Sequence, residues 1–307
     1  MSHCPERIPD APSRHWVNRT PARVRPFLQL SRLDRPVGYW LLALPGWVGL
    51  LLPCYLCRPG WDPVASPLLW GALILIGAIA MRGAGCTYND IVDRELDAKV
   101  ERTRSRPLPS GRVSVKQAWG WLFAQVGIGF LVWLALPLSA KLVALASLPL
   151  VAAYPFMKRI TGFPQVWLGL TFNWAVLVAY SVKAGGLHAS VLLVYAGLAA
   201  WTVGYDTIYA MQDAEDDALA GIKSTALTFG SRVRAGVAVS YAVSVALVTW
   251  GLLVSTEPRA AWAVVPFAAH LLWQVVALRE ERALGLFKSN GWACVLLVVG
   301  LVASQLL

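Results

Sequence analysis

Long apolar runs constrain this 307-residue chain more than any other feature. Nine stretches reach or approach the 20 or so apolar residues that a helix needs to cross a hydrocarbon core of about 30 Å. Their approximate ranges are 38–57, 66–88, 116–136, 139–157, 164–182, 188–208, 233–254, 260–278 and 291–307. Because a backbone in lipid must satisfy its own hydrogen bonds, each run is expected to be helical. The sequence therefore predicts an all-α, polytopic membrane protein with nine transmembrane helices.

The placement of the charges gives the orientation of these spans. The net charge is +10, from 27 Lys and Arg against 17 Asp and Glu, and only 14% of residues are charged, compared with about 25% in a soluble domain. With the N-terminus in the cytoplasm, all but five of the basic residues fall on the cytoplasmic side, as the positive-inside rule requires. The basic surplus therefore indicates topology, and no nucleic-acid partner is expected.

The chain begins with a polar extension, residues 1–26, ahead of what we expect to be a single transmembrane domain, residues 27–307. The extension lacks the apolar core of a signal peptide, and it is short for a mitochondrial presequence followed by a mature start. We therefore expect a bacterial inner-membrane protein, with the mitochondrial inner membrane as the alternative. Cys54 and Cys57 form a lone CxxC in an apolar run, which favours packing over a metal or redox role.

Acidic residues concentrate in two long loops on the predicted cytoplasmic side, after the second and the sixth span. Each cluster contains residues spaced so that a continuing helix would put them on one face. The first set is Asn89, Asp93 and Asp97, at i, i+4 and i+8. The second set is Asp206, Tyr209, Asp213 and Asp217, at i, i+3, i+7 and i+11. Long, charged loops in a chain whose other connections are short indicate function.

Carboxylates at this spacing repel one another along a helix face, so a cation is expected beside them. Oxygen ligands suit Mg²⁺, which proteins hold with a few carboxylates plus substrate phosphates. Two such faces turned toward each other would bind a di-magnesium diphosphate. The alternative is a solvated acidic loop or charges at helix ends, which explains one such cluster better than two on the same side of the membrane.

Basic residues lie near both clusters. Arg82 is inside a span, two turns before Asn89, and an intramembrane Arg is costly and by default functional, with the acidic cluster or a bound phosphate as its partner. Lys158 and Arg159 end the fourth span, and Lys223 follows the second cluster. For these three, topology alone and binding of an anion both remain open.

The two motifs resemble those of the UbiA superfamily of intramembrane prenyltransferases, which carry NDxxDxxxD after the second helix and a second Asp-rich motif after the sixth. The first is matched by Asn89-Asp90-x-x-Asp93-x-x-x-Asp97, and the second by the set from Asp206 to Asp217. The resemblance begins at about residue 27 and includes the segments 34–38, 82–86, 106–111, 154–159, 206–211 and 221–226. These flanks are most similar to the 4-hydroxybenzoate polyprenyltransferase branch of the superfamily.

The resemblance implies that a polyprenyl group passes from polyprenyl diphosphate to C3 of 4-hydroxybenzoate, releasing diphosphate, in ubiquinone biosynthesis. It also implies helices around a central cavity that is capped by the two cytoplasmic-side loops. The Mg²⁺ ligands implied are Asn89, Asp93, Asp213 and Asp217, with Asp97 and Asp206 completing the shell. The residues implied to hold substrate are Arg82, Lys158 and Lys223 on the diphosphate, with Tyr209 of the second motif.

Three further roles stay open. Asp90 either accepts the phenolic proton or caps the helix. Arg159 either pairs with the benzoate carboxylate or serves topology only. Tyr154 either faces the allylic cation with its ring or is an ordinary interfacial Tyr. Among functions, another superfamily enzyme with a haem, menaquinone or tocopherol-type acceptor is the nearest alternative, and a cation-coupled transporter is a remote one.

Overall fold

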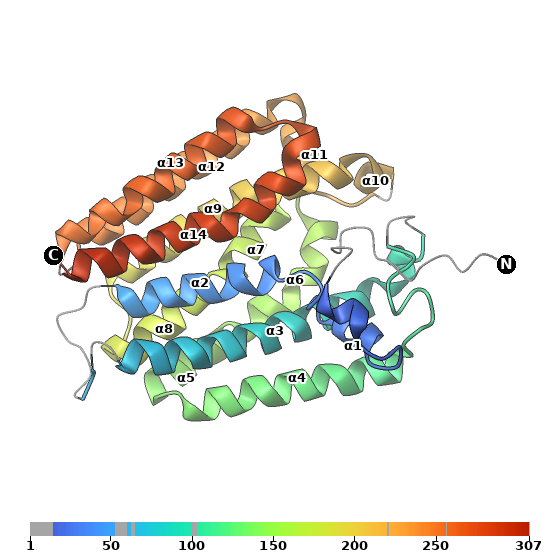
Figure 1. Cartoon of the computed structure of the whole chain (residues 1–307). Helices are drawn as coiled ribbons and strands as arrows, with labels where there is room; N and C mark the ends of the chain where they lie inside the picture. The colour runs from blue at the N-terminus through green and yellow to red at the C-terminus, as the bar shows by residue number, and fades with distance from the viewer. Residues whose placement is uncertain are drawn as a thin grey trace. The chain divides into compact units, whose positions relative to one another are not determined.

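The structure is a computed structural model that describes residues 15–52, 60–62, 65–99, 103–219, 221–255 and 257–306. These residues form helices joined by turns, and they contain no strand. The α-helices, labelled in Figure 1, are α1 Arg25–Leu30, α2 Val37–Leu51, α3 Ala65–Asp97, α4 Val115–Ala135, α5 Leu138–Ala146, α6 Leu148–Ile160, α7 Pro164–Phe172, α8 Trp174–Ala184, α9 Ala189–Ala210, α10 Ala214–Leu219, α11 Thr225–Phe229, α12 Val233–Leu253, α13 Val264–Ala277 and α14 Ala283–Leu306. The all-α prediction is confirmed.

Eight of the predicted spans are long and apolar enough to cross a membrane within the described part of the chain. The remaining one, predicted at 38–57, corresponds to the 15-residue α2, which falls short of the usual length. Residues 53–59, including Cys54 and Cys57, lie outside the described residues. The protein is thus a multi-pass membrane protein, and eight of the nine predicted crossings meet the length criterion.

Two predicted spans consist of paired helices instead of single ones. The span predicted at 139–157 divides into α5 and α6 at Ser147, because Pro149 at the start of α6 lacks the N–H that a continuing helix needs. The span predicted at 164–182 divides into α7 and α8 at Asn173. The buried Asn173 side chain donates from Nδ2 to the Gly169 carbonyl at 2.8 Å and to Thr202 Oγ1 at 2.7 Å, which satisfies backbone and side-chain groups at the break.

The last span begins earlier than predicted. We expected a helix over 291–307, whereas α14 begins at Ala283. The additional turns include polar residues such as Asn290, which is fully buried and accepts a hydrogen bond from Trp201 Nε1 at 2.8 Å. The apolar run therefore underestimates the length of the helix. A polar side chain can be part of the buried helix because it has a hydrogen-bond partner inside the protein.

The longest helix, α3, explains how the first motif is placed. Its 33 residues span about 50 Å at 1.5 Å per residue, well beyond a hydrocarbon core of about 30 Å. The apolar part fills the first two thirds, and Asn89, Asp93 and Asp97 occupy the last three turns. The second span continues helically through the motif, which is the condition under which Asn89, Asp93 and Asp97 share one face.

The chain divides by its contacts into two compact units, which we describe separately. Unit 1 consists of residues 1–40 and 76–132, and unit 2 of residues 41–75 and 133–307. Both α2 and α3 contribute residues to each unit. The division does not test the prediction of a single domain over 27–307, which stays a prediction.

Unit 1 has a small apolar core that joins α1, the end of α3, the loop over 103–113 and α4. The buried members of this core are Leu30, Ile91, Leu108, Val113, Ala118 and Leu122. Phe27, Tyr88, Val115 and Trp121 pack against them. Ile91 lies between Asp90 and Asp93 in the sequence, so the motif is part of a packed helix and not of a loose loop.

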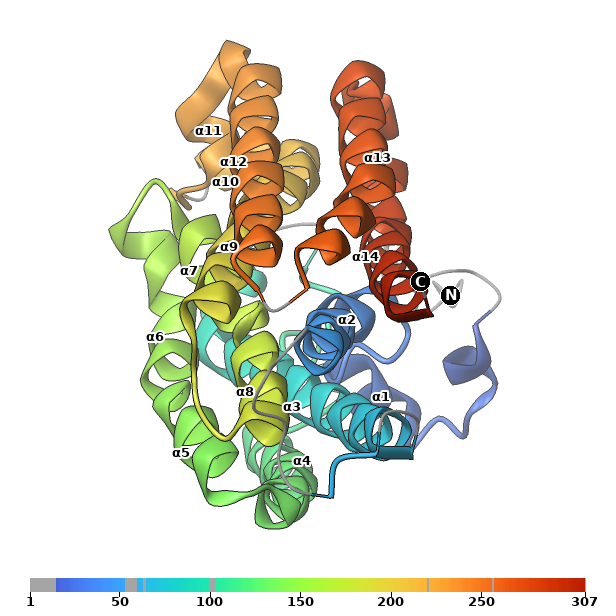
Figure 2. The same ribbon diagram turned by 90° about the vertical axis from the view of Figure 1, so that its left-hand side faces the viewer.

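Unit 2 is organised around α9, which packs against both α7 and α12 (Figure 2). A Cβ on Gly197 of α9 would lie 2.9 Å from Val248 N and 3.0 Å from Ser244 O, both on α12. A small residue is therefore required where these two helices approach each other, as is common for helices in membranes. This packing fixes the helix that leads into the second motif.

Candidate functional site

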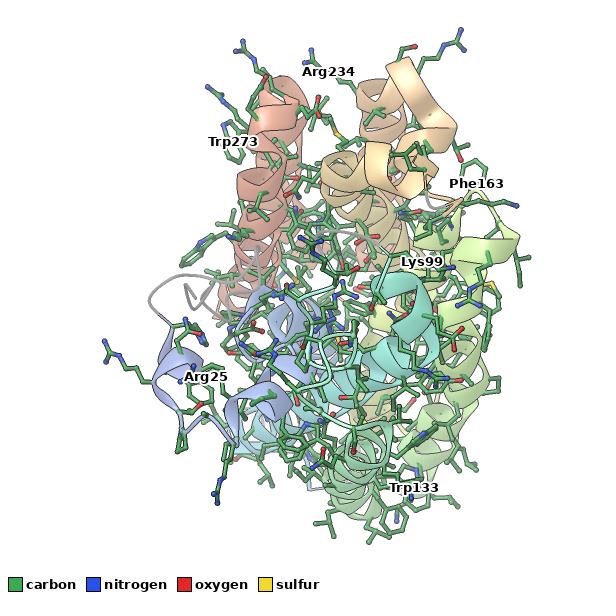
Figure 3. The ribbon with its side chains drawn as sticks, turned by 90° about the vertical axis from the view of Figure 1, so that its right-hand side faces the viewer. Arg25, Lys99, Trp133, Phe163, Arg234 and Trp273 are labelled. Carbon is green, nitrogen blue, oxygen red and sulfur yellow. The ribbon has the colours of Figure 1, made fainter. Side chains whose placement is uncertain are left out.

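The first motif lies on one face of α3, as its spacing predicts. Asp93 is fully buried and Asp97 is 7% exposed, while Asn89 is half-buried. Lys99 follows the end of the helix, where Figure 3 labels it. The structure therefore presents an amide and two carboxylates along the last turns of a single rigid helix.

Two arginines from other segments of unit 1 reach the carboxylates of this motif. Arg32 Nη2 lies 2.7 Å from Asp90 Oδ1, and Arg106 Nη1 lies 3.5 Å from the same oxygen. Arg106 Nη1 also lies 2.7 Å from Asp97 Oδ2. Asp97, predicted as an outer Mg²⁺ ligand, is thus already held by a cation in this structure.

The interpretation of Asp90 as a helix cap is wrong. Asp90 lies seven residues before the end of α3, within its continuous hydrogen bonding, whereas a capping side chain belongs to the residues flanking a helix. Sequence reasoning also missed Arg32, which is 58 positions from its partner, and it named Arg106 only as part of a flanking segment. No signal in the sequence points from Arg32 to Asp90.

Arg82 is half-buried in the same helix and contacts two small residues of unit 1. Its Nη1 donates to Cys86 Sγ one turn later. A Cβ built on Gly38 would lie 2.9 Å from Arg82 Nε, so a side chain at that position would displace the guanidinium. The flanking segments 34–38 and 82–86, which carry the resemblance, are therefore in contact with each other.

The second motif departs from the predicted geometry. The shared face requires a helix that continues from Asp206 to Asp217, but α9 ends at Ala210 and a 3₁₀ turn over Met211–Asp213 precedes α10. A 3₁₀ turn has 3.0 residues instead of 3.6, so the i, i+7 and i+11 positions no longer share one α-helical face. The side chains of Asp213 and Asp217 lie outside the described residues.

The described part of the second motif packs on an aromatic row. Asp206 and Tyr209 are both half-buried. The Tyr209 ring lies 4.6 Å from the Phe287 ring, centroid to centroid, so this ring is supported by α14. Its predicted contact with substrate stays a prediction.

Three predicted substrate cations gather at the C-terminal end of α6. Lys158 and Arg159 are in its last turn. The Lys223 backbone N–H donates to the Lys158 carbonyl at 2.9 Å, and Lys223 Nζ donates to the Ile160 carbonyl at 3.1 Å. Tyr154 lies on α6 one turn before Lys158, on the same face. The structure thus brings Lys158, Arg159 and Lys223 together.

The loop over 161–165 and the segment that follows the second motif are docked on each other in unit 2. Thr225 N–H donates to Gln165 Oε1 at 3.0 Å, and Thr228 Oγ1 donates to the Gly162 carbonyl at 2.8 Å. Phe163, labelled in Figure 3, packs edge-on against Phe229. Thr225 also hydrogen-bonds to Thr207 of α9 at 2.5 Å, so the position of Lys223 is tied to the helix that carries Asp206.

The donor groups of the first motif fit Mg²⁺ in type. Asn89 and Asp93 offer an amide and a carboxylate oxygen on adjacent turns, and Mg²⁺ completes its shell with waters and substrate phosphates. Among the described side chains, no three His, Cys, Asp or Glu lie close enough together to hold a metal ion alone. A site that needs phosphate oxygens from the substrate agrees with both observations.

Comparison with known proteins decides the family. The family model described as "UbiA prenyltransferase family" matches residues 39–303. The chain belongs to this family. It is 41% identical over 288 residues to the mitochondrial 4-hydroxybenzoate polyprenyltransferase of Aedes aegypti, covering 92% of this chain and 64% of that relative. It is 36% identical over 295 residues to the 4-hydroxybenzoate octaprenyltransferase of Pseudomonas putida, covering 93% of this chain and 95% of that relative.

Solved structures of UbiA homologues share the fold. The apo structure of a homologue from Aeropyrum pernix has a TM-score of 0.72 at 24% identity, covering 88% of this UbiA-family chain and 98% of the other. A homologue from Archaeoglobus fulgidus bound to GPP and Mg²⁺ has a TM-score of 0.68 at 19% identity, covering 92% and 100%. The predicted membership of the superfamily, made from the two motifs and their flanks, is confirmed.

Proposed function

We propose that this protein transfers a polyprenyl group from polyprenyl diphosphate to C3 of 4-hydroxybenzoate, with release of diphosphate, in ubiquinone biosynthesis. The observation that carries this proposal is the similarity to 4-hydroxybenzoate prenyltransferases over more than nine tenths of the chain. The first motif supports it, since its ligands are intact and its helix is packed.

In this proposal Asn89, Asp93, Asp213 and Asp217 hold Mg²⁺, and Asp97 and Asp206 complete the shell. Bound Mg²⁺ neutralises the charge that develops on diphosphate as the allylic C–O bond breaks. The GPP and Mg²⁺ bound by the Archaeoglobus fulgidus homologue support a divalent metal. Asp97 can serve only to the extent that Arg106 shares its carboxylate, because the two are paired at 2.7 Å.

Arg82, Lys158 and Lys223 bind the diphosphate oxygens. The juxtaposition of Lys158 and Lys223 through their backbones supports a shared role for these two. Lys158 is in the last turn of α6 and the Lys223 ammonium contacts its last carbonyl, where the helix dipole favours cations. Lys223 already donates to the Ile160 carbonyl, so it binds an anion with its remaining two protons.

The acceptor interacts with the polar groups around α6 and α9. Arg159 is exposed at the end of α6 and pairs with the benzoate carboxylate in a bidentate contact. Tyr154 and Tyr209 offer ring faces to the allylic cation and the aromatic acceptor. Water must be kept from the cation, since it would quench the reaction. The central cavity implied by the resemblance stays a prediction.

The test is a membrane assay with one labelled polyprenyl diphosphate and a panel of acceptors. Formation of 3-polyprenyl-4-hydroxybenzoate, identified by mass spectrometry, with a requirement for Mg²⁺, supports the proposal. Prenylation of a haem, menaquinone or tocopherol-type acceptor in its place would assign another activity within the family. Ion flux without prenyl transfer would favour a transporter.

We also propose that the N-terminus faces the cytoplasm of a bacterial inner membrane, with the mitochondrial inner membrane as the alternative. The curated relatives include a mitochondrial protein and a bacterial one. The orientation is tested with Arg23→Cys as the single Cys of the chain, since Arg23 is in the exposed N-terminal segment. Its labelling by an impermeant thiol reagent is compared between inverted and right-side-out vesicles. Labelling only from the right-side-out vesicles would contradict it.

A further inference from the structure

Arg32 has a backbone conformation that is unusual for an arginine. Its φ is +55°, and it is the only non-glycine residue with a positive φ in the described part of the chain. The left-handed region is sterically unfavourable for residues with a Cβ, and glycine is the usual occupant. An arginine in this conformation indicates a use for its side chain.

The turn around Arg32 is a C-terminal helix cap of the Schellman type. Arg32 N–H donates to the Gln29 carbonyl at 3.1 Å, and Leu33 N–H donates to the Leu28 carbonyl at 3.1 Å. This pattern places Arg32 at the position that glycine normally fills after a helix. The cap alone would therefore be better served by glycine, and it does not explain the guanidinium.

The guanidinium of Arg32 is directed at the first motif. Its Nη2 binds Asp90 Oδ1 at 2.7 Å, with the Arg32 side chain 10% exposed and Asp90 fully buried. Arg32 Nη1 also donates to the Gln29 carbonyl at 3.1 Å, and this second contact fixes the orientation of the guanidinium. A buried ion pair is stronger than an exposed one, and the Arg32 guanidinium is held at two points, by Asp90 and by the Gln29 carbonyl. It therefore restrains the Asp90 carboxylate firmly.

Arg106 extends this pair into a chain of four alternating charges: Arg32, Asp90, Arg106 and Asp97. The chain is electrically balanced, as a buried set of charges needs to be. Asp90 and Asp97 are seven residues apart and therefore on one side of α3. The two arginines grip that side over two turns.

We propose that Arg32 is a positioning residue, which with Arg106 holds Asp90 as a fixed counter-ion. This contact sets the rotation of the last turns of α3 about the helix axis. That rotation determines the direction in which the Asn89 and Asp93 side chains point. This inference takes the role of Asn89 and Asp93 as Mg²⁺ ligands from the proposed function. It assigns Asp90 to anchoring and removes it from the transfer of the ring proton. The burial of Asp90 and its engagement by two guanidinium groups support that assignment.

The decisive variant is Arg32→Gly, because glycine suits the backbone at this position, so that the side chain with its guanidinium is removed without straining the turn. The full-length protein is compared with wild type in lipid nanodiscs by hydrogen exchange across residues 86–99, without metal or substrate. We expect exchange there to accelerate at least tenfold, because the end of α3 loses its anchor. We expect kcat to fall at least tenfold and the Mg²⁺ concentration for half-maximal activity to rise, with the KM for 4-hydroxybenzoate unchanged.

Two further variants sharpen the readout. Arg32→Lys keeps a cation in reach of Asp90, and it should recover much of the wild-type exchange and kcat. Arg23→Gly removes an equal charge from an exposed position of the same segment, and it should match wild type in both measurements. A loss shared by Arg23→Gly and Arg32→Gly would show a general effect of charge and would overturn the inference.

The other outcomes are equally distinct. A raised KM for 4-hydroxybenzoate with unchanged exchange in Arg32→Gly would make Arg32 an acceptor-binding residue and overturn the proposal. If Arg32→Gly does not fold, Asp90→Asn replaces it: anchoring requires activity and exchange to change together, whereas loss of activity with unchanged exchange would make Asp90 the base. Absence of Mg²⁺-dependent prenyl transfer by wild type would refute the proposed function, while the exchange comparison would still report on the anchor.

Discussion

Gly38 lies against the guanidinium of Arg82 so closely that a Cβ on Gly38 would come within 2.9 Å of Arg82 Nε. The two residues belong to the segments 34–38 and 82–86, which are conspicuous in the sequence for different reasons. Arg82 is a charge in an apolar helix, whereas Gly38 carries no side chain at all. Their contact shows that the space for the guanidinium is made by the absence of a methyl group.

Gly38→Ala is therefore expected to displace the Arg82 side chain. Because Arg82 is proposed to bind diphosphate, the apparent KM for the prenyl diphosphate should rise several-fold in steady-state kinetics. Gly85→Ala, one turn of the same helix beyond Arg82, is the control, since nothing lies within 4 Å of a Cβ there. Equal kinetics for the two variants would show that the Gly38 contact does not set the Arg82 position.

Arg82→Ala should weaken the binding of the polyprenyl diphosphate far more than the binding of the acceptor. The loss of one charge-assisted contact, worth about 1.5–3 kcal/mol, predicts a rise of about 10- to 100-fold in the apparent KM for polyprenyl diphosphate. The KM for 4-hydroxybenzoate should change by less than about threefold. An unchanged diphosphate constant would remove Arg82 from this role.

Asp93→Ala and Asp213→Ala are each expected to abolish turnover while the protein still inserts and folds. Each removes a proposed Mg²⁺ ligand, so neither defect should be overcome by saturating substrate. Product formation in the membrane assay measures the loss. Glu95→Ala is the matched control for Asp93→Ala, because the Glu95 side chain is 81% exposed two residues further along the same helix.

Gln165→Leu should destabilise the loop that supports Lys223. It leaves the buried Thr225 N–H without its acceptor, and an unsatisfied buried donor costs about 1–3 kcal/mol. We expect a lower midpoint of thermal unfolding in detergent and a higher KM for the diphosphate. Gln165→Glu keeps an acceptor oxygen in the first turn of α7, where the helix dipole favours a negative charge, and should retain more stability. The reverse order of the two variants would contradict this account.

Chelation by EDTA should stop prenyl transfer, and Mg²⁺ should restore it. Mg²⁺ prefers near-octahedral oxygen coordination and keeps part of its hydration, so Ca²⁺ at the same concentration should restore much less activity. The assay is initial velocity against added metal after dialysis. Full activity in the chelated enzyme would reject the metal requirement.

The sequence predicts local features of the fold well and distant pairings poorly. The i, i+4, i+8 spacing of Asn89, Asp93 and Asp97 identifies a helix face, because that relation depends only on helical geometry. The pairing of Arg32 with Asp90 depends on a left-handed turn and on the packing of two segments 58 residues apart. Neither is encoded in a local pattern.

The second motif shows where local spacing is insufficient. Its residues fit a continuous helix as well as those of the first motif do, yet a 3₁₀ turn over Met211–Asp213 interrupts it. Following this turn, the chain returns through Thr225, which bonds both Thr207 and Gln165. These tertiary contacts, which spacing cannot reveal, constrain the segment on the far side of the turn.

The unbroken course of α3 has a mechanical consequence. Arg82 and Asn89 are seven residues apart on one helix, and so are separated by about 10 Å along its axis. When the surrounding lipid thickens or thins, the helix tilts as a single rod and carries both groups with it. The distance between Arg82, the proposed phosphate-binding cation, and Asn89, the proposed metal ligand, is therefore independent of the composition of the bilayer.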